Sequence, residues 1–259
     1  MLKIQAIPGF TDNYFWLLTR AGYTGAAIVD PGDAVPVQRR LQALGVQLET
    51  ILITHKHPDH VGGIRTLKAA WPDAVVYGPN NEQIELLDQR VGQGDLIRLP
   101  GLSCTLEVLD VPGHTKGHIA YKSSGSVFCG DTLFAGGCGR VFCGTFAQLH
   151  ASLQQLAALP AETQLYCAHE YTQDNLGFAA WVEPDNPALL ARIQQVEQLR
   201  AANQATVPSL LADELATNPF LRTTQETVIQ AAETWAGQSL TTSAAVFQAL
   251  RTWKDTEYD

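Results

Sequence analysis

The sequence predicts an α+β protein, in which a domain of mixed strands and helices is followed by a smaller all-helical domain. Short apolar strand patterns occur among helical patterns as far as about residue 170, and the rest of the chain has helical periodicity almost throughout. We place the boundary near Tyr171, so that the predicted domains are residues 1–170 and 171–259. Histidines and carboxylates at the ends of strand patterns predict a functional site in the first domain.

The first domain contains apolar runs that predict strands. The run at residues 50–54 is unbroken, and the run at residues 26–30 ends at Pro31-Gly32. Two later runs, joined by Ser123-Ser124-Gly125, predict a hairpin. The predicted strands are residues 26–30, 50–54, 75–77, 96–99, 104–111, 119–122, 127–129 and 164–167.

Apolar residues at helical spacing predict helices between these strands. Each pattern stops at a glycine or a proline, as helices commonly do. The patterns are Val37, Leu41 and Leu44 before Gly45; Ile64, Leu67 and Trp71 before Pro72; and Leu149, Leu153 and Leu156 before Pro160. Beyond Tyr171, Asn186-Pro187 is typical of a helix start, and further helices are predicted at residues 209–215, 226–236 and 241–253.

Composition excludes several classes of protein. With 259 residues, 46% hydrophobic and 17% charged residues, the chain is neither disordered, nor collagen-like, nor a small disulfide-stapled domain. Lysine and arginine number 17 against 26 aspartates and glutamates, a net charge of -9. Nucleic acids and anionic membranes both require a basic face, so we expect neither as a partner.

Cysteine usage and the lack of long apolar runs indicate the compartment. No apolar run approaches the ~20 residues of a membrane span, and Gln5 and Pro8 interrupt the stretch where a signal peptide would need its apolar core. The five cysteines are odd in number and contain no C-x-x-C pair. We therefore expect a reduced, cytoplasmic protein, and we expect it to be a monomer.

A group of metal-binding residue types follows the strand at residues 50–54. Its sequence is Thr54-His55-Lys56-His57-Pro58-Asp59-His60. Side chains alternate in an extended segment, so His55 and His57 point the same way, whereas Asp59 and His60 begin the next turn and can face a second position. A solvated polar loop is the ordinary alternative, but four such groups rarely follow a buried strand by chance. One segment can therefore supply ligands to two metal ions.

Further candidate ligands stand at the ends of other strand patterns. His114 follows Pro112-Gly113, Asp131 closes the hairpin, and His169 follows residues 164–167. Alone, Asp131 could be a turn cap and His169 a core histidine. Imidazole and carboxylate without thiolate suit zinc, iron or manganese, and a shared carboxylate is typical of two-metal sites, so Asp131 is the candidate bridge. We leave His118 and His150 out of the ligand set, as structural and surface residues.

The motif set resembles the metallo-β-lactamase fold superfamily, with T-H-x-H-x-D-H followed by a later histidine, aspartate and histidine. More narrowly, the chain is similar to the glyoxalase II (hydroxyacylglutathione hydrolase) family. Four local features carry that resemblance: residues 10–14, residues 130–134 with 137–140, residues 168–172 with Asn175, and Asn218-Pro219-Phe220. The resemblance implies an αββα sandwich followed by a helical domain. It also implies hydrolysis of S-D-lactoylglutathione, and of other S-2-hydroxyacylglutathiones, to the hydroxy acid and glutathione, the second step of methylglyoxal detoxification.

The resemblance further implies a role for each site residue. One metal ion would be held by His55, His57 and His114, the other by Asp59, His60 and His169, with Asp131 bridging. The ions would be two divalent metals, zinc for preference, with iron or manganese also suitable. A water held by the metals, with Asp59 and Asp131 as catalytic ligands, would supply hydroxide near neutral pH and attack the thioester carbonyl, whose oxyanion a cation would stabilise. By residue type, Cys138 and Cys143 are alternative nucleophiles, but we expect both to have packing roles.

The same resemblance implies contacts with the glutathione part of the substrate. These would come from Arg140, Tyr171, Asn175, Arg251 and Lys254. The last two stand at the edge of an apolar stripe on the helix predicted at residues 241–253. The chain departs from the family pattern at Arg140, where lysine is usual, and at Phe142, where a tyrosine hydroxyl would bind the peptide. Arg140 can still bind a carboxylate, whereas Phe142 cannot donate a hydrogen bond.

Three other functions remain open from the sequence. A persulfide dioxygenase of the same superfamily would use one iron and consume oxygen. A lactonase or β-lactamase would hydrolyse a cyclic substrate. A metal-binding scaffold would retain the ligands without turnover. The identity of the metals in the cell and the preferred acyl group are not determined by the residues.

Overall fold

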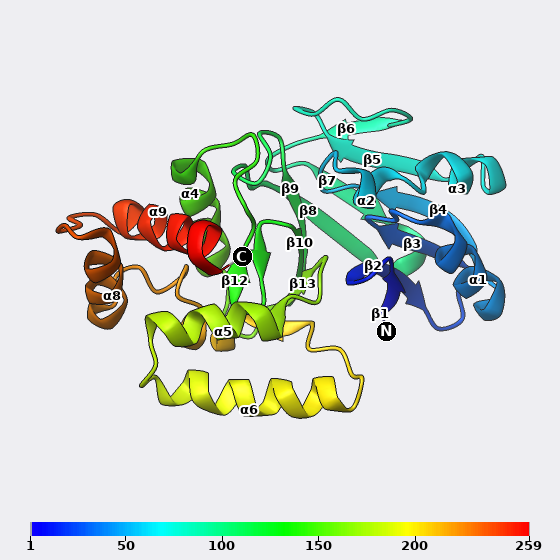
Figure 1. Ribbon diagram of the computed structural model, residues 1–259. Helices are drawn as coiled ribbons and strands as arrows, with labels where there is room; N and C mark the ends of the chain where they lie inside the picture. The colour runs from blue at the N-terminus through cyan, green and yellow to red at the C-terminus, as the bar shows by residue number, and fades with distance from the viewer. Residues whose placement is uncertain (1, 259) are drawn as a thin grey trace. The chain divides into compact units, whose positions relative to one another are not determined.

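The computed structural model describes residues 2–258, which form two compact units. Unit 1 contains residues up to Asp110 together with Lys116–Gly130. Unit 2 contains Val111–Thr115 and the residues from Asp131 onward. Figure 1 labels most of the helices and strands of both units.

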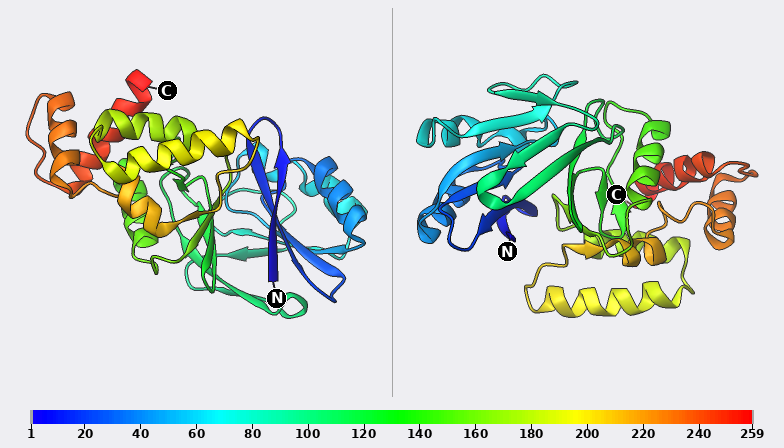
Figure 2. Two further views of the ribbon diagram at one scale, coloured as in Figure 1. Left: turned by 90° about the horizontal axis from the view of Figure 1, so that it is seen from below. Right: turned by 180° about the vertical axis from the view of Figure 1, so that it is seen from behind.

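Unit 1 is built on a six-stranded sheet in which sequence order is also spatial order. The pairs β1–β2 and β2–β3 are antiparallel, whereas β3–β4, β4–β5 and β5–β6 are parallel. Figure 2 shows the first two strands in blue from two further sides. The strands are β1 (Leu2–Gly9), β2 (Asn13–Arg20), β3 (Gly25–Val29), β4 (Gln47–Leu52), β5 (Val75–Pro79) and β6 (Gln89–Val91).

Helices α1 (Ala34–Leu44) and α3 (Ile64–Ala70) bury their apolar faces in the core of this sheet. Asp33 caps α1 by accepting a hydrogen bond from the Val35 N–H, and Gly45 ends it with a φ of 65°. Val37, Leu41, Ile64 and Leu67 of the predicted faces share the core with Ile28, Ile51 and Val76. Leu44, predicted on the same face, is exposed in the last turn of α1. The short α2 (Pro58–Val61) lies between β4 and α3.

Four more strands of unit 1 pair antiparallel in the order β10-β9-β8-β7. The predicted hairpin is confirmed, with Val127 opposite Lys122 and Gly125 at a φ of 71° in the turn. The strands are β7 (Leu96–Leu99), β8 (Cys104–Asp110), β9 (Ile119–Ser123) and β10 (Ser126–Gly130), with the 3-10 turn η1 (Pro100–Leu102) after β7. The end of β10 places Asp131 directly at the start of the next segment.

Unit 2 is mainly helical. Asn186 caps α6 through the N–H groups of Ala188 and Leu189, as its sequence predicts. Helix α5 packs on α6, α8 on α9, and α4 on α9. The helices are α4 (Phe146–Ala157), α5 (Thr172–Val182), α6 (Pro187–Ala201), α7 (Leu211–Thr217), α8 (Glu226–Ala236), α9 (Ser243–Trp253) and the terminal π-helix η2 (Lys254–Tyr258). Its strands are β11 (Leu133–Phe134), β12 (Gly137–Cys138), β13 (Gln164–Cys167) and β14 (Ser209–Leu210).

The structure differs from the sequence-based elements in several places. Strands β1, β2, β6, β11 and β12 were not predicted, because β1 is interrupted by polar residues and the last two strands have only two residues each. The helix predicted at residues 209–215 is wrong at its start, since Ser209 and Leu210 pair with β13 before α7 begins. Within residues 2–258, no helix is long and apolar enough to cross a membrane.

Candidate metal centre and substrate cavity

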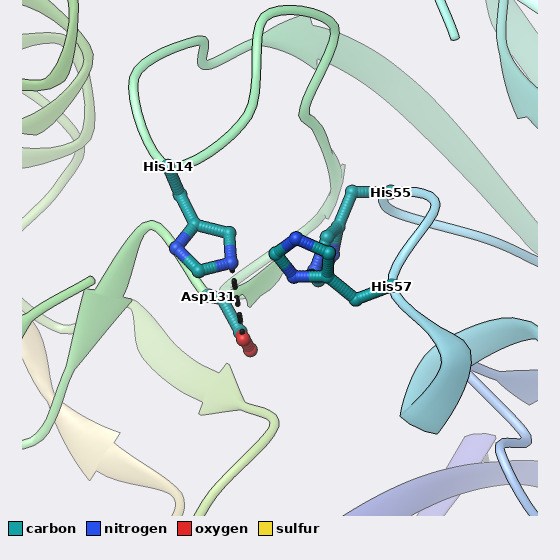
Figure 3. A group of neighbouring side chains, drawn as sticks. All are labelled: His55, His57, His114 and Asp131. Carbon is teal, nitrogen blue, oxygen red and sulfur yellow. Dashed lines mark hydrogen bonds and ion pairs between the residues drawn. The ribbon is translucent and has the colours of Figure 1, made fainter. Parts of the chain in front are cut away.

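The loop between β4 and α2 orients His55 and His57 toward each other. The Nε2 atom of His55 lies 2.9 Å from the Nδ1 atom of His57 (Figure 3). Behind His55, its Nδ1 atom lies 3.1 Å from the Thr54 hydroxyl, which itself donates to Asp30 at 2.7 Å. Because that hydroxyl proton is used on Asp30, Thr54 accepts from the His55 Nδ1–H, and the lone pair of His55 is at Nε2.

The next two candidate ligands, Asp59 and His60, lie in the first turn of α2. The Nε2 atom of His60 is 3.4 Å from Asp59 Oδ2, and its Nδ1 atom is 3.1 Å from Asp30 Oδ2. Asn13 donates to Asp59 Oδ2 at 3.0 Å. Neighbouring polar side chains therefore lie against both Asp59 and His60, and His60 is fully buried.

Asp30 was not among the predicted site residues. It is buried, its φ is 50°, and its second oxygen accepts the Thr54 N–H at 2.8 Å. Aspartate tolerates this left-handed conformation better than most residues. The signal in the sequence was Asp30-Pro31-Gly32 at the end of an apolar run. Gly32 is required because a Cβ there would lie 1.8 Å from the Asp59 carbonyl oxygen.

In unit 2, Asp131 lies between His114 and His169. One carboxylate oxygen, Oδ2, is 3.5 Å from His114 Nε2, and the other, Oδ1, is 3.4 Å from His169 Nε2 (Figure 3 shows the first contact). His114 Nδ1 lies 2.8 Å from the Arg140 carbonyl oxygen. A carbonyl only accepts, so Nδ1 carries the proton and the lone pair of Nε2 faces Asp131.

The candidate ligands of each unit have donor atoms that suit transition-metal ions. His114 bonds the Arg140 carbonyl through one ring nitrogen, and one ring nitrogen of His60 lies 3.1 Å from the Asp30 carboxylate, so each ring has an oxygen behind it, as metal-ligating histidines usually do. The donors are imidazole nitrogens and carboxylate oxygens, with no thiolate among them. Such a set suits zinc, iron and manganese.

Unit 2 also contains a cavity of about 310 Å³ next to His114 and Asp131. All five residues predicted to bind the glutathione part of the substrate line it. The lining residues are His114, Asp131, Phe134, Cys138, Arg140, Phe142, Tyr171, Asp174, Asn175, Arg251 and Lys254.

Carboxylates accompany each of the three cations in this cavity. Asp255 Oδ1 lies 2.8 Å from Arg251 Nη2 and 3.1 Å from Arg140 Nε, and Asp174 lies 3.3 Å from Lys254 Nζ. Arg251 and Lys254 are only 2% and 4% exposed, so they lie deeper than the edge of a stripe that the helical spacing predicted. The apolar stems of these side chains are therefore packed within unit 2.

The uncharged cavity residues have distinct surroundings. The Tyr171 ring stacks on His169 with centroids 4.7 Å apart. Asn175 is buried and donates to the Ala135 carbonyl at 3.1 Å, so its amide has a backbone partner. Phe142 is 63% exposed and meets His114 edge-on at 5.2 Å. Aromatic rings thus flank both candidate ligand histidines of this unit, His114 and His169.

The surroundings of Cys138, His118 and His150 indicate structural roles for these residues. Burial raises the pKa of the Cys138 thiol to about 11, although Arg251 opposes this shift. His118 is buried and stacks on His55, with centroids 4.6 Å apart. His150 is half-buried against Phe247 rather than on the surface, and burial lowers the pKa of its ring.

Comparison with known proteins identifies the class to which this fold and these residues belong. Residues 9–169 match the model of the metallo-β-lactamase superfamily, and residues 170–257 match the model described as the hydroxyacylglutathione hydrolase C-terminus. The structure resembles that of the BLEG-1 B3 metallo-β-lactamase, with a TM-score of 0.64 at 21% identity over 85% of this chain and 99% of that one. It also resembles ETHE1 from Myxococcus xanthus, with a TM-score of 0.59 at 27% identity over 82% and 94% of the two chains.

A curated relative from Alkalilimnicola ehrlichii is more similar in sequence. It is named hydroxyacylglutathione hydrolase and is 54% identical over 255 residues, which cover 98% of this chain and 99% of the relative. The chain therefore belongs to the hydroxyacylglutathione hydrolase family of enzymes, within the metallo-β-lactamase superfamily. The predicted fold class and family are confirmed.

Proposed function

We propose that this protein hydrolyses the thioester of S-D-lactoylglutathione and of related S-2-hydroxyacylglutathiones, releasing the hydroxy acid and glutathione. The observation that carries the proposal is the position of Asp131, with one oxygen toward His114 and the other toward His169. A carboxylate in this arrangement can hold two metal ions at the short separation that hydrolytic two-metal sites use.

The metal ligands proposed for the two ions are those expected from the family. His55, His57 and His114 hold one ion, Asp59, His60 and His169 hold the other, and Asp131 belongs to both. We propose zinc as the preferred ion, because imidazole and carboxylate suit it, with iron or manganese accepted by the same donors. When bound, the two ions supply hydroxide near neutral pH and stabilise negative charge on the thioester oxygen.

The residues of the chain provide orientation and charge for this reaction. Asp59 and Asp131 serve as ligands only, and the Arg140 carbonyl keeps the lone pair of His114 at Nε2. Arg140, Arg251 and Lys254 attract the carboxylates of the glutathione part, while Tyr171 and Asn175 line the same cavity. A thiolate is a good leaving group, so no buried thiol or other acid of the cavity needs to protonate it.

We further propose that residues 1–170 act as the metal-binding catalytic domain and residues 171–259 as the substrate-binding domain. The net charge of -9 supports the absence of nucleic acid and anionic membrane partners. We also propose that the protein is cytoplasmic and monomeric. Gel filtration tests the monomeric state.

The test combines metal analysis with one thioesterase assay. The purified protein should contain two transition-metal ions per chain and release thiol from S-D-lactoylglutathione, and a chelator should abolish turnover. Full activity of the metal-free protein would contradict the proposal, as would saturation at one ion. Oxygen uptake with one bound iron would indicate a persulfide dioxygenase, and turnover of a cyclic ester alone would indicate a lactonase. Bound metal without any turnover would indicate a scaffold.

A further inference from the structure

The β11–β12 hairpin of unit 2 follows Asp131 closely and forms part of the cavity wall. It spans residues 133–138, with Phe134 and Cys138 lining the cavity and Gly136 in the turn at a φ of 72°. Strands of two residues cannot hold a defined position through their own ladder. The hairpin therefore depends on contacts from the helices around it.

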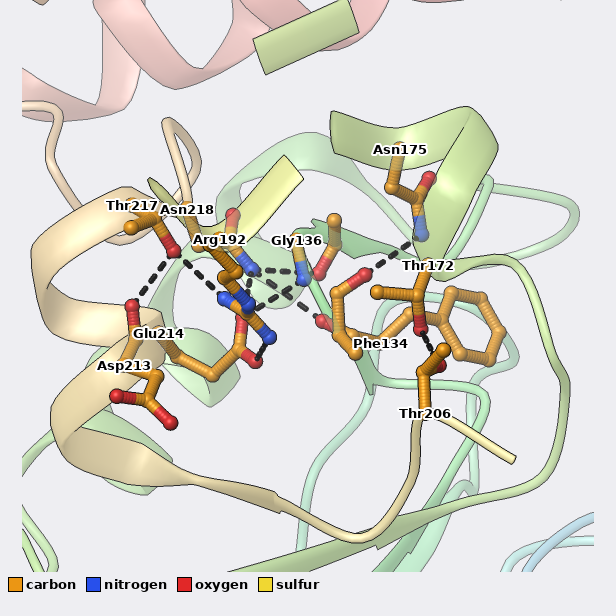
Figure 4. Close-up of polar contacts among 12 residues, drawn as sticks. Phe134, Gly136, Thr172, Asn175, Arg192, Thr206, Asp213, Glu214, Thr217 and Asn218 are labelled. Carbon is orange, nitrogen blue, oxygen red and sulfur yellow. Dashed lines mark hydrogen bonds and ion pairs between the residues drawn. The ribbon is translucent and has the colours of Figure 1, made fainter. Parts of the chain in front are cut away.

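Two side chains of α7, Glu214 in its first turn and Asn218 at its C-cap, bond the backbone of this hairpin (Figure 4). Glu214 accepts the Gly136 N–H at 2.8 Å. Asn218 donates to the Gly137 carbonyl at 2.9 Å and to the Phe134 carbonyl at 3.3 Å, and it also donates to Glu214 at 3.1 Å. Asn175 and Arg251 add bonds to the carbonyls of Ala135 and Cys138. Side chains thus bond the backbone on both strands and at the turn.

Glu214 is fully buried, and Arg192 supplies its counter-charge. The Arg192 guanidinium bonds the Glu214 carboxylate and also donates to Thr217 Oγ1 at 2.6 Å. A buried carboxylate is costly unless it is paired and fully hydrogen-bonded. One carboxylate oxygen accepts from Gly136 and Asn218 while the other accepts from Arg192, and a neutral amide, with a single acceptor oxygen, could not serve all three donors.

Backbone contacts connect the end of this hairpin to Asp131 and its neighbour Thr132. The Gly139 N–H, directly after β12, donates to the Thr132 carbonyl at 3.2 Å. A Cβ on Gly139 would lie 1.9 Å from the Asp131 carbonyl oxygen, so the returning chain lies directly against that residue. A shift of the hairpin would therefore shift the backbone of Asp131 as well.

We propose that Glu214 and Asn218 are positioning residues for the reaction: together they hold the β11–β12 hairpin and thereby the Asp131 carboxylate and the adjoining cavity wall. The inference rests on the proposed role of Asp131 as a metal ligand. Neither residue lines the cavity or belongs to the groups of candidate metal ligands. Their effect on metal affinity and turnover acts through the backbone of the hairpin.

The test compares Glu214→Gln and Asn218→Ala with Glu183→Gln in the full chain. Glutamine at 214 keeps an acceptor for Gly136 but loses the charge, and alanine at 218 removes the bonds to the hairpin while keeping the Glu214–Arg192 pair. Glu183 is a matched control, because it is also buried and paired with arginine, accepting from Arg222 at 2.7 and 3.0 Å, outside the hairpin contacts. Each variant is melted by circular dichroism, and its Zn²⁺ affinity is measured by competition with a chromogenic chelator.

Positioning predicts that Glu214→Gln and Asn218→Ala lower Zn²⁺ affinity by about tenfold or more, the scale found when residues supporting metal ligands are lost. We expect kcat to fall with it, and Glu183→Gln to lower the melting temperature only. Unchanged Zn²⁺ affinity and kcat in a folded Asn218→Ala variant would overturn the inference, even if Glu214→Gln does not fold. Wild-type protein that binds two ions but does not hydrolyse the thioester would contradict the proposed function, while the Zn²⁺ affinities would still decide the role of the hairpin contacts.

Discussion

His60 directs its Nδ1 atom at Asp30, whose Oδ2 atom lies 3.1 Å away inside unit 1. Asp30 also accepts the hydroxyl and the N–H of Thr54, so one buried carboxylate holds the start of the histidine loop and lies against the ring of His60. A carboxylate behind a histidine raises its basicity and fixes which nitrogen is available to a metal. Asp30 thus supports the proposed metal centre without being a ligand.

Replacing Asp30 with asparagine should weaken metal binding by about ten- to hundredfold, the range typical of residues that support metal ligands. The side-chain shape is retained, but the negative charge and one acceptor are lost. Chelator competition measures the effect. Asp33→Asn is the control, because Asp33 only caps α1 through the Val35 N–H at 2.9 Å. Equal metal affinity in the two variants would contradict this role.

Replacing Asp131 with asparagine should reduce metal occupancy and lower kcat by at least about a hundredfold, the scale of losing a group that stabilises the transition state. The amide keeps the size of the side chain, but only one of its two terminal atoms can still act as an acceptor. Elemental analysis and steady-state kinetics measure both effects. Asp110→Asn, at the end of β8, is the matched control. Near-normal kcat with two ions bound would show that Asp131 is a turn residue.

The sequence was informative where a function depends on neighbours in the chain. The residues from His55 to His60 are one segment, so their types and spacing predict a metal site without any knowledge of the fold. His114 and Asp131 were found because they follow strand patterns. In the structure, His114 Nε2 lies 3.5 Å from Asp131 Oδ2. Their local pattern was enough because strand ends commonly carry binding residues.

Roles that depend on tertiary contacts were not predictable in the same way. Asp30 acts through a left-handed backbone and through residues more than twenty positions away. Asn175 and Arg251 were expected to bind substrate, and both line the cavity, yet each also bonds a carbonyl of the β11–β12 hairpin. No periodicity reveals such backbone contacts, because they depend on how distant segments pack.

Replacing Lys254 with methionine should raise KM for glutathione thioesters by about tenfold or more, with a smaller change in kcat, because a charge-assisted contact to substrate is lost. Such a contact stabilises the ground state and the transition state alike. Lys254 is a cleaner probe than Arg251, since Arg251 also bonds the Cys138 carbonyl at 3.1 Å.

Steady-state kinetics with two substrates measure this effect. A lactoyl thioester of an uncharged thiol should react equally well with the variant and with the wild type. Lys68→Met is the control, because Lys68 pairs with Asp88 at 2.9 Å within unit 1. An unchanged KM for the glutathione thioester would remove Lys254 from the substrate site.

The raised pKa of Cys138 should appear as a loss of stability at high pH. Burial raises the pKa of this thiol to about 11, above the roughly 8.5 of an unfolded chain, although Arg251 opposes the shift. The folded state therefore favours the protonated thiol. Its contribution is fully present below about pH 8.5 and is lost as the pH rises toward about 11. Between these limits, the free energy of unfolding of the wild type should fall by about 2 to 3 kcal/mol more than that of Cys138→Ala. Urea titrations at several pH values measure the difference. Parallel profiles would mean that the thiol ionises as readily in the folded chain as in the unfolded one, and the argument against Cys138 as a nucleophile would lose its physical basis.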